Sequence, residues 1–197
     1  GAIPAKLPTD DAGKKAALDK TADLANKALA GIQGMLPKAD PALKAQLEQA
    51  EGSVHATLGL VAYNRSDYPK SIQEYELALQ KTPKDEVAHY YLALIHQTLA
   101  AQSSREYQAA VKSENDAKAA KAEQPVIDEI VAKRTGLQED INKYRDKAID
   151  EFALTVAIGG QLATQAKDQL TKLWSVKNND STAGMDDFIQ EKKKTLG

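Results

Sequence analysis

The sequence has 197 residues, enough for one domain of ordinary size with a substantial core. Its 26 basic and 28 acidic residues are interspersed, so the chain lacks the dense positive charge that nucleic acid or an anionic membrane surface requires. The absence of cysteine excludes disulfides, thiolate metal sites and cysteine nucleophiles.

The composition predicts an all-α fold. Hydrophobic residues make up 42% of the chain but aromatic residues only 5%, and helix-forming residues such as alanine, leucine, lysine and glutamate dominate. No apolar stretch approaches the roughly 20 residues of a membrane span. The opening Gly1 to Pro4 is compatible with a mature terminus, which leaves two alternatives for localisation: exported or periplasmic after loss of a signal peptide, or cytoplasmic.

We expect residues 1–8, which contain two prolines, to form an extended lead-in to a single helical domain over residues 9–197. Thr9 or Asp10 can cap a first helix that ends at Pro37. Asp40 then caps a second, long helix with a proline at its first position, and this helix runs to about Tyr63.

Three further helices are predicted before residue 125. Asp67 can cap a third helix over residues 68–81, and Asp85 a fourth that ends near Gln102. Ser103 and Glu106 have the spacing of a capping box, which predicts a fifth helix from Arg105 to about Glu123.

After Pro125 the apolar residues form one seam on a helix of about 30 residues, unless Gly136 interrupts it. The pair Gly159 and Gly160 is typical of a helix end. Two more helices follow within residues 161–197, which brings the expected number to about eight.

The chain contains an internal repeat. A shift of 34 positions aligns similar residues at four places within a short window: His55 with His89, Leu58 with Leu92, Leu60 with Leu94, and Val61 with Ile95. A helix hairpin of this length that recurs along the chain indicates a repeat architecture.

The repeat resembles the tetratricopeptide family. The positions of that family's pattern are occupied by His55, Leu58, Gly59, Ala62, Ser71, Tyr75, Ala78 and Pro83, and five of the eight fit it. The chain departs from it at His55, Ala62 and Ser71, where the family has tryptophan, tyrosine and alanine. The best repeat covers residues 52–83.

Further repeats are less regular. We expect a degenerate second repeat over residues 86–120 and a partial third over residues 125–160, where Ala148 and Phe152 fit the second helix. Residues 161–197 would form capping helices. The tail from Ala157 to Leu196 resembles the ends of small exported repeat proteins of soil bacteria.

The sequence does not predict an enzyme, a metal site or a cofactor. His89 and His96 are seven positions apart, too far to bind one ion without other ligands, and the repeat places His55 and His89 on the face where helices pack. Adjacent carboxylates such as Asp186 and Asp187 point about 100° apart on a helix and do not form an acid/base pair.

The resemblance implies a binding surface. First helices of successive repeats line the concave face in this family, so the resemblance places Ser53, Ala56 and Val87 in the groove and predicts a partner-binding face made of Leu60, Tyr63, Asn64, Tyr90, Leu94, Gln97 and Thr98. Tyrosine suits such a face because it offers a wide apolar area and a polar tip. Thr57 and Tyr91 occupy the places where the family clamps a peptide carboxylate, so that mode is not expected.

We therefore expect a non-enzymatic module that binds a peptide or protein segment through this face. The alternative is a small-ligand carrier with an apolar cavity enclosed by the helices. The sequence predicts no nucleic-acid partner and no membrane span, and it leaves the oligomeric state open.

Overall fold

The computed structural model describes residues 10–197, so the lead-in expected at residues 1–8 lies outside the described residues. The described part is all-helical, without a β-strand, which confirms the predicted fold class. Its elements are α1 (Asp11–Met35), the short 3-10 helix η1 (Leu36–Lys38), α2 (Pro41–Asn64), α3 (Tyr68–Lys81), α4 (Glu86–Ala119), α5 (Gln124–Ile158), α6 (Ala163–Lys177) and α7 (Met185–Thr195).

Residues 10–197 contain seven α-helices rather than about eight, because no helix begins at Ser103. α4 continues through this position, and Ser103 is a buried residue inside it. The capping-box prediction at Ser103 and Glu106 is therefore wrong. A capping residue must have non-helical backbone geometry. Ser103 instead lies inside α4, in a stretch along which α5 packs on both sides of this residue.

Four predicted caps are confirmed among the described helices. In each, an aspartate oxygen accepts a hydrogen bond from the backbone amide three residues later, which satisfies one free donor of the opening turn. The distances are 2.7 to 3.2 Å for Asp10, Asp40, Asp67 and Asp85. Short acidic caps thus define where α1 to α4 begin.

α5 ends at Gly159, as predicted, with a left-handed φ of +79°. The carboxylate of Glu86 in α4 accepts a hydrogen bond from the Leu162 amide at 2.7 Å. It lies so close to Gly160 that a Cβ atom there would be 2.2 Å from Glu86 Oε2. The turn between α5 and α6 is therefore anchored to the start of α4.

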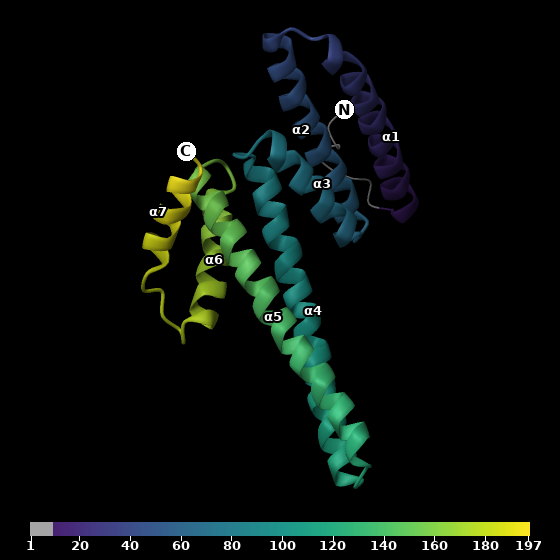
Figure 1. The fold of residues 1–197 in the computed structure, drawn as a ribbon, viewed down its shortest axis with the longest axis vertical. Helices are drawn as coiled ribbons and strands as arrows, with labels where there is room; N and C mark the ends of the chain where they lie inside the picture. The colour runs from purple at the N-terminus through teal and green to yellow at the C-terminus, as the bar shows by residue number, and fades with distance from the viewer. Residues whose placement is uncertain (1–9) are drawn as a thin grey trace.

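Two antiparallel helix pairs form the framework of the molecule (Figure 1). α2 and α3 make a short hairpin, with α1 packed on α2, and α4 and α5 make a much longer one. α6 and α7 both pack against α5. The distal parts of α4 and α5 extend away from the other helices, and we call this part, residues 103–143, the arm. No helix within residues 10–197 is long and apolar enough to cross a membrane.

Buried side chains form two clusters, and α4 contributes to both. The first, between α3 and α4, contains Tyr75, Ala78, Ala88, Leu92 and Ile95. The second joins α4 to the C-terminal helices and contains Ala93, Ala148, Ile149, Phe152, Ala153, Ala166, Leu170, Met185 and Ile189. Because its two sides face different clusters, the first half of α4 is buried almost all round.

The two helix hairpins share a packing pattern. In the first, the Tyr75 ring lies so close to Gly59 that a Cβ there would be 2.9 Å from it, and Ser71 Oγ donates a hydrogen bond to the Gly59 carbonyl at 2.8 Å. In the second, Phe152 packs with Ala93, which follows Gly59 by 34 positions. A small residue on one helix thus faces an aromatic ring on the other in both hairpins.

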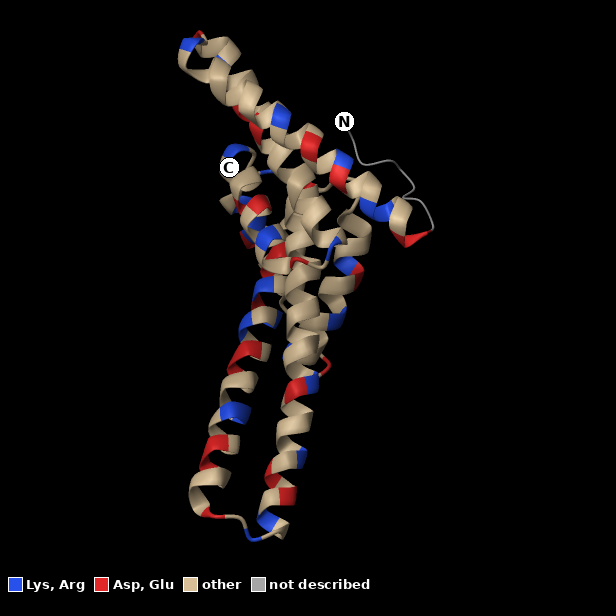
Figure 2. Cartoon of the chain, turned by 90° about the vertical axis from the view of Figure 1, so that its right-hand side faces the viewer, with Lys and Arg blue, Asp and Glu red and all other residues tan. Residues whose placement is uncertain are grey.

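The arm carries charged residues of both signs along its length (Figure 2). Glu114 connects its two helices, because Arg134 Nε of α5 lies 2.8 Å from one carboxylate oxygen and Lys118 pairs with the other. The hydrogen bond from Lys118 and the charge of Arg134 outweigh desolvation and lower the pKa of Glu114. This ion-pair group links the two helices of the arm.

Candidate functional site

The predicted partner-binding face lies on α2 and α4. Leu60 and Tyr63 are part-buried on α2 beside the exposed Asn64, and the four remaining residues are part-buried on α4: Tyr90, Leu94, Gln97 and Thr98. Asn64 and Thr98 use their side chains within their own helices, bonding the carbonyls of Leu60 and Leu94 at 2.8 Å. The remaining five supply most of the face.

Tyr91 joins the two halves of this face. Its ring centroid lies 5.0 Å from that of Tyr63 and 5.9 Å from that of Tyr90, and both pairs are edge-to-face. Tyr68 extends the row, with its ring 6.3 Å from Tyr63. Sequence reasoning did not place Tyr91 in the face, although the run of two tyrosines in α4 was a visible signal.

The structure does not bring all seven predicted residues into one cluster. Leu60 and Tyr63 pack against the buried cluster of α3 and α4, whereas Tyr90 and Leu94 pack against the cluster shared with α5 and α6. Burial raises the pKa of Tyr63 and of Tyr91, so both phenols are neutral donors at neutral pH. The face therefore spans the junction between the two hairpins.

A cleft of about 600 Å³ continues the α2 half of the face. Gln49 and Ser53 line it from α2, opposite the turn around Pro83. Gln49, Ser53, Ala56, Leu60 and Tyr63 follow one another at steps of four and three, so they lie on one side of α2. This side is about 21 Å long at 1.5 Å per residue.

At its other edge the face reaches α6. Gln97 on α4 donates a hydrogen bond to Gln169 on α6 at 3.3 Å. α6 therefore lies beside the α4 end of the face.

The repeat-related histidines are engaged in pairs. His55 Nδ1 lies 2.7 Å from Glu74, and His89 Nδ1 lies 2.6 Å from Glu151, while His89 Nε2 contacts the Pro83 carbonyl. Burial opposes the charged form of His89, but the hydrogen bond and charge of Glu151 outweigh it and raise the pKa. No group of three or more His, Asp or Glu residues in the described part of the chain is arranged to hold a metal ion.

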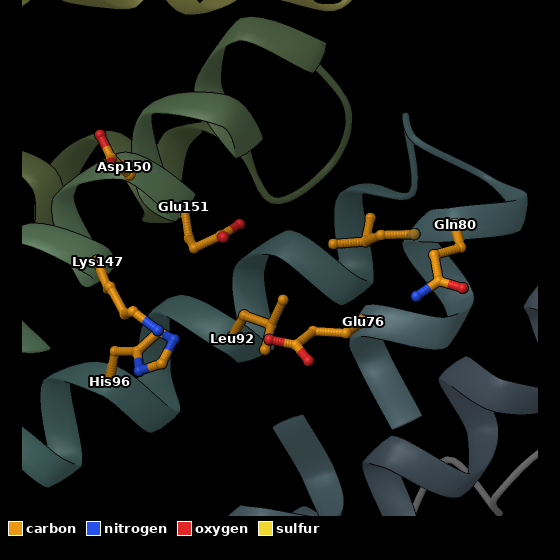
Figure 3. A pocket seen from close by; sticks show the side chains of 8 residues that line it. Glu76, Gln80, Leu92, His96, Lys147, Asp150 and Glu151 are labelled. Carbon is orange, nitrogen blue, oxygen red and sulfur yellow. The ribbon is translucent and has the colours of Figure 1, made fainter. Parts of the chain in front are cut away.

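A second cleft, which sequence reasoning missed, lies between α3, α4 and α5 (Figure 3). It has a volume of about 510 Å³ and is open to solvent. Its lining residues are Glu76, Leu79, Gln80, Leu92, His96, Lys147, Asp150 and Glu151. Leu92 and His96 follow Tyr90 and Leu94 by two positions each, about 200° around the helix, so this cleft and the predicted face lie on opposite sides of α4.

His96 is the most perturbed ionisable group of the cleft. It is 5% exposed, its ring stacks on Tyr144 with centroids 6.0 Å apart, and its Nδ1 has no hydrogen-bond partner among the described residues. Burial, together with the charges of Lys147 and Lys143, lowers the pKa of His96 to about 4. The ring is therefore neutral at physiological pH.

The cleft residues form pairs four positions apart in the sequence: Glu76 with Gln80, Leu92 with His96, and Lys147 with Glu151. Such spacing shows that each pair shares one side of its helix. It does not show which helices line one cleft together, and the α3 and α5 residues of this cleft are more than sixty positions apart in the sequence.

These two surfaces, on opposite sides of α4, are the candidate sites. The face on α2 and α4 is long and rich in tyrosine, and the cleft is shorter and lined by charged groups. Comparison of the chain with protein-family models, with curated proteins and with solved structures gives no match.

Proposed function

We propose that this protein is a non-enzymatic interaction module that binds an extended or helical segment of a partner protein. The binding surface is the face on α2 and α4, from the cleft at Gln49 and Ser53 to the tyrosines at the junction of the two hairpins. The proposal includes a tetratricopeptide-like origin for these hairpins, which the small-to-aromatic packing of both supports.

The observation that carries the proposal is the row formed by Tyr63, Tyr91 and Tyr90. All three rings are held by mutual edge contacts and are only part-buried. Tyrosines held in this way lose little side-chain entropy on binding and present apolar area with a hydrogen-bonding tip, which is why they are frequent at the energetic centres of interfaces.

The cleft supports a segment longer than a single side chain. Ser53 lines the cleft, and helix spacing places Ala56 and Leu60 on the same side of α2. A strip about 21 Å long accommodates roughly four turns of a partner helix, because a helix rises 5.4 Å per turn. The second expectation, a carrier with an enclosed apolar cavity, stays a prediction, and the clefts described here open to solvent.

The test is affinity capture from the organism that encodes the chain, followed by measured affinities for each captured protein. Ser53→Arg and Asn64→Arg place bulky charges on exposed positions of the face without disturbing buried residues. A partner that binds here should lose at least about tenfold in affinity, or 1.4 kcal/mol. Tyr107→Ala, on the arm, is the matched control and should bind normally.

Tyr63→Ala with Tyr90→Ala provides a second variant, checked by circular dichroism because Tyr90 also packs against Phe152. If every captured protein binds the two arginine variants as tightly as the unmodified chain, the proposed face is wrong.

A further inference from the structure

We propose that the cleft between α3, α4 and α5 binds a primary amine on an alkyl chain, whose far end carries an oxygen acceptor. A lysyl side chain with its backbone carbonyl has this chemistry. The site is independent of the proposed function above, because it lies on the opposite side of α4.

The amine end is defined by two carboxylates. Glu76 comes from α3 and Glu151 from α5, and Figure 3 shows both groups reaching over the stretch of α4 that carries Leu92. Glu151 uses only Oε2 in its contact with His89. Leu79 and Leu92 supply apolar surface beside the carboxylates, which suits an alkyl stem that ends in a cation.

The spacing of these groups favours an organic cation over a metal ion. Within residues 10–197 no three metal-ligating side chains converge, as noted above. Asp150, the third carboxylate of the lining, already pairs with Lys192 at 2.8 Å. An ammonium group, which donates three hydrogen bonds in freely chosen directions, can bind to carboxylates such as Glu76 and Glu151 without the tight geometry of a metal.

The acceptor end is defined by His96 and Lys147. Lys147 precedes Glu151 by one helical turn, yet no ion pair joins them among the described residues, and Figure 3 shows its chain running toward His96. His96 is more than nine-tenths buried and its Nδ1 lacks a partner. Buried polar atoms without partners are uncommon and costly. A ligand oxygen at this end would accept a hydrogen bond from the ammonium of Lys147 and lie beside the imidazole of His96.

The cleft volume of about 510 Å³ falls within the range of small-ligand sites, which is roughly 300 to 1,000 Å³. It accepts one amine-bearing chain rather than a folded domain. The lysyl ammonium can come from a protein segment or from the free amino acid, and the probes below separate these sources.

The experiment is a titration of the full chain, followed by isotope-edited NMR, with three probes: cadaverine, L-lysine, and Nα-acetyl-lysine N-methylamide. Glu76→Gln is the test variant, because Glu76 is exposed and the substitution removes its charge while keeping its size. Glu129→Gln, an exposed carboxylate on the arm, is the matched control. We expect Glu76→Gln to weaken binding at least about fivefold, or 1 kcal/mol, and Glu129→Gln to leave it unchanged.

Each outcome decides a part of the proposal. Tighter binding of the acetylated amide than of cadaverine supports the acceptor at His96, and its preference over L-lysine points to a lysyl residue of a protein. Tighter binding of L-lysine points to the free amino acid. Binding of cadaverine alone retains the amine site but overturns the acceptor. Absence of binding by all three at millimolar concentration, or equal loss in both variants, overturns the proposal.

Discussion

The Nδ1 atom of His89 lies 2.6 Å from the carboxylate of Glu151, which follows it by 62 positions. His55 makes the same contact with Glu74 after only 19 positions. The difference, 62 − 19 = 43 residues, is close to the length of the arm, residues 103–143. The second hairpin therefore has the histidine and carboxylate pair of the first, and the arm, which extends both of its helices, accounts for the greater separation in sequence.

The close contact between Gly59 and Tyr75 predicts a large effect of a small substitution. Gly59→Ala places a methyl group 2.9 Å from the fully buried ring of Tyr75. We expect a loss of about 1 to 3 kcal/mol in the free energy of unfolding, since neither α2 nor α3 can move without disturbing other buried contacts. Urea denaturation followed by circular dichroism measures it.

Gly136→Ala is the matched control for this prediction. Gly136 is also inside a helix, but no atom lies within 4 Å of its hypothetical Cβ. Alanine there should stabilise α5 by about 1 kcal/mol through its higher helix propensity. Equal effects of the two substitutions would show that helix propensity, rather than the packing of Tyr75, governs position 59.

His96 predicts that stability falls in mild acid. Its pKa is about 4 in the folded chain, against an ordinary value of 6.5. Between these values the unfolded state binds more protons, so the free energy of unfolding decreases as the pH falls from 6.5 toward 4. We expect His96→Phe, which keeps a ring against Tyr144, to remove about 1 kcal/mol of this decrease at pH 5, after allowance for solvent near the ring.

His89 provides a contrast of opposite sign. Because its pKa is raised, it contributes stability below pH 6.5 that is lost as the pH rises through the folded-state value. His89→Gln should therefore cost more stability at pH 6 than at pH 8, whereas His96→Phe should gain more at pH 5 than at pH 7. Parallel pH profiles for the two variants would contradict the opposite environments of the two rings.

Much of the fold follows from local signals in the sequence. The aspartate caps at Asp40, Asp67 and Asp85 mark helix starts because each satisfies its own opening turn, and Gly159 marks an end because its backbone is left-handed. Ser103 shows the limit of such signals. Its spacing to Glu106 is that of a cap, but burial against neighbouring helices holds the residue inside α4.

The candidate sites were predictable only in part. Tyr63 and Tyr90 follow from the repeat, which relates one first helix to the next. The cleft with Glu76 and Glu151 does not, because it depends on α3 lying beside the second half of α5. That arrangement depends on how far α4 and α5 extend before the chain turns back, and the alanine- and charge-rich sequence of the arm does not indicate which residues of the two helices lie opposite each other.

Shortening the arm tests whether the rest of the fold depends on it. Tyr107 on α4 and Arg134 on α5 face each other across it, with a contact of 3.5 Å between the phenol oxygen and the guanidinium. Replacement of residues 107–134 by a short Asn-Gly loop joins α4 and α5 at positions that lie opposite each other in the hairpin. We expect the shortened chain to unfold cooperatively and to keep the spectroscopic signature of the His89 pair with Glu151, since both buried clusters lie outside the deleted part.

A matched control removes residues from one helix only, for example 107–113, which shifts α4 against α5 by about two turns and leaves Arg134 opposite the wrong residues. That variant should lose much of its stability while the symmetric one keeps it, as measured by thermal unfolding and by the histidine resonances in NMR. Collapse of the symmetric variant to a molten state would mean that the arm belongs to the folding core.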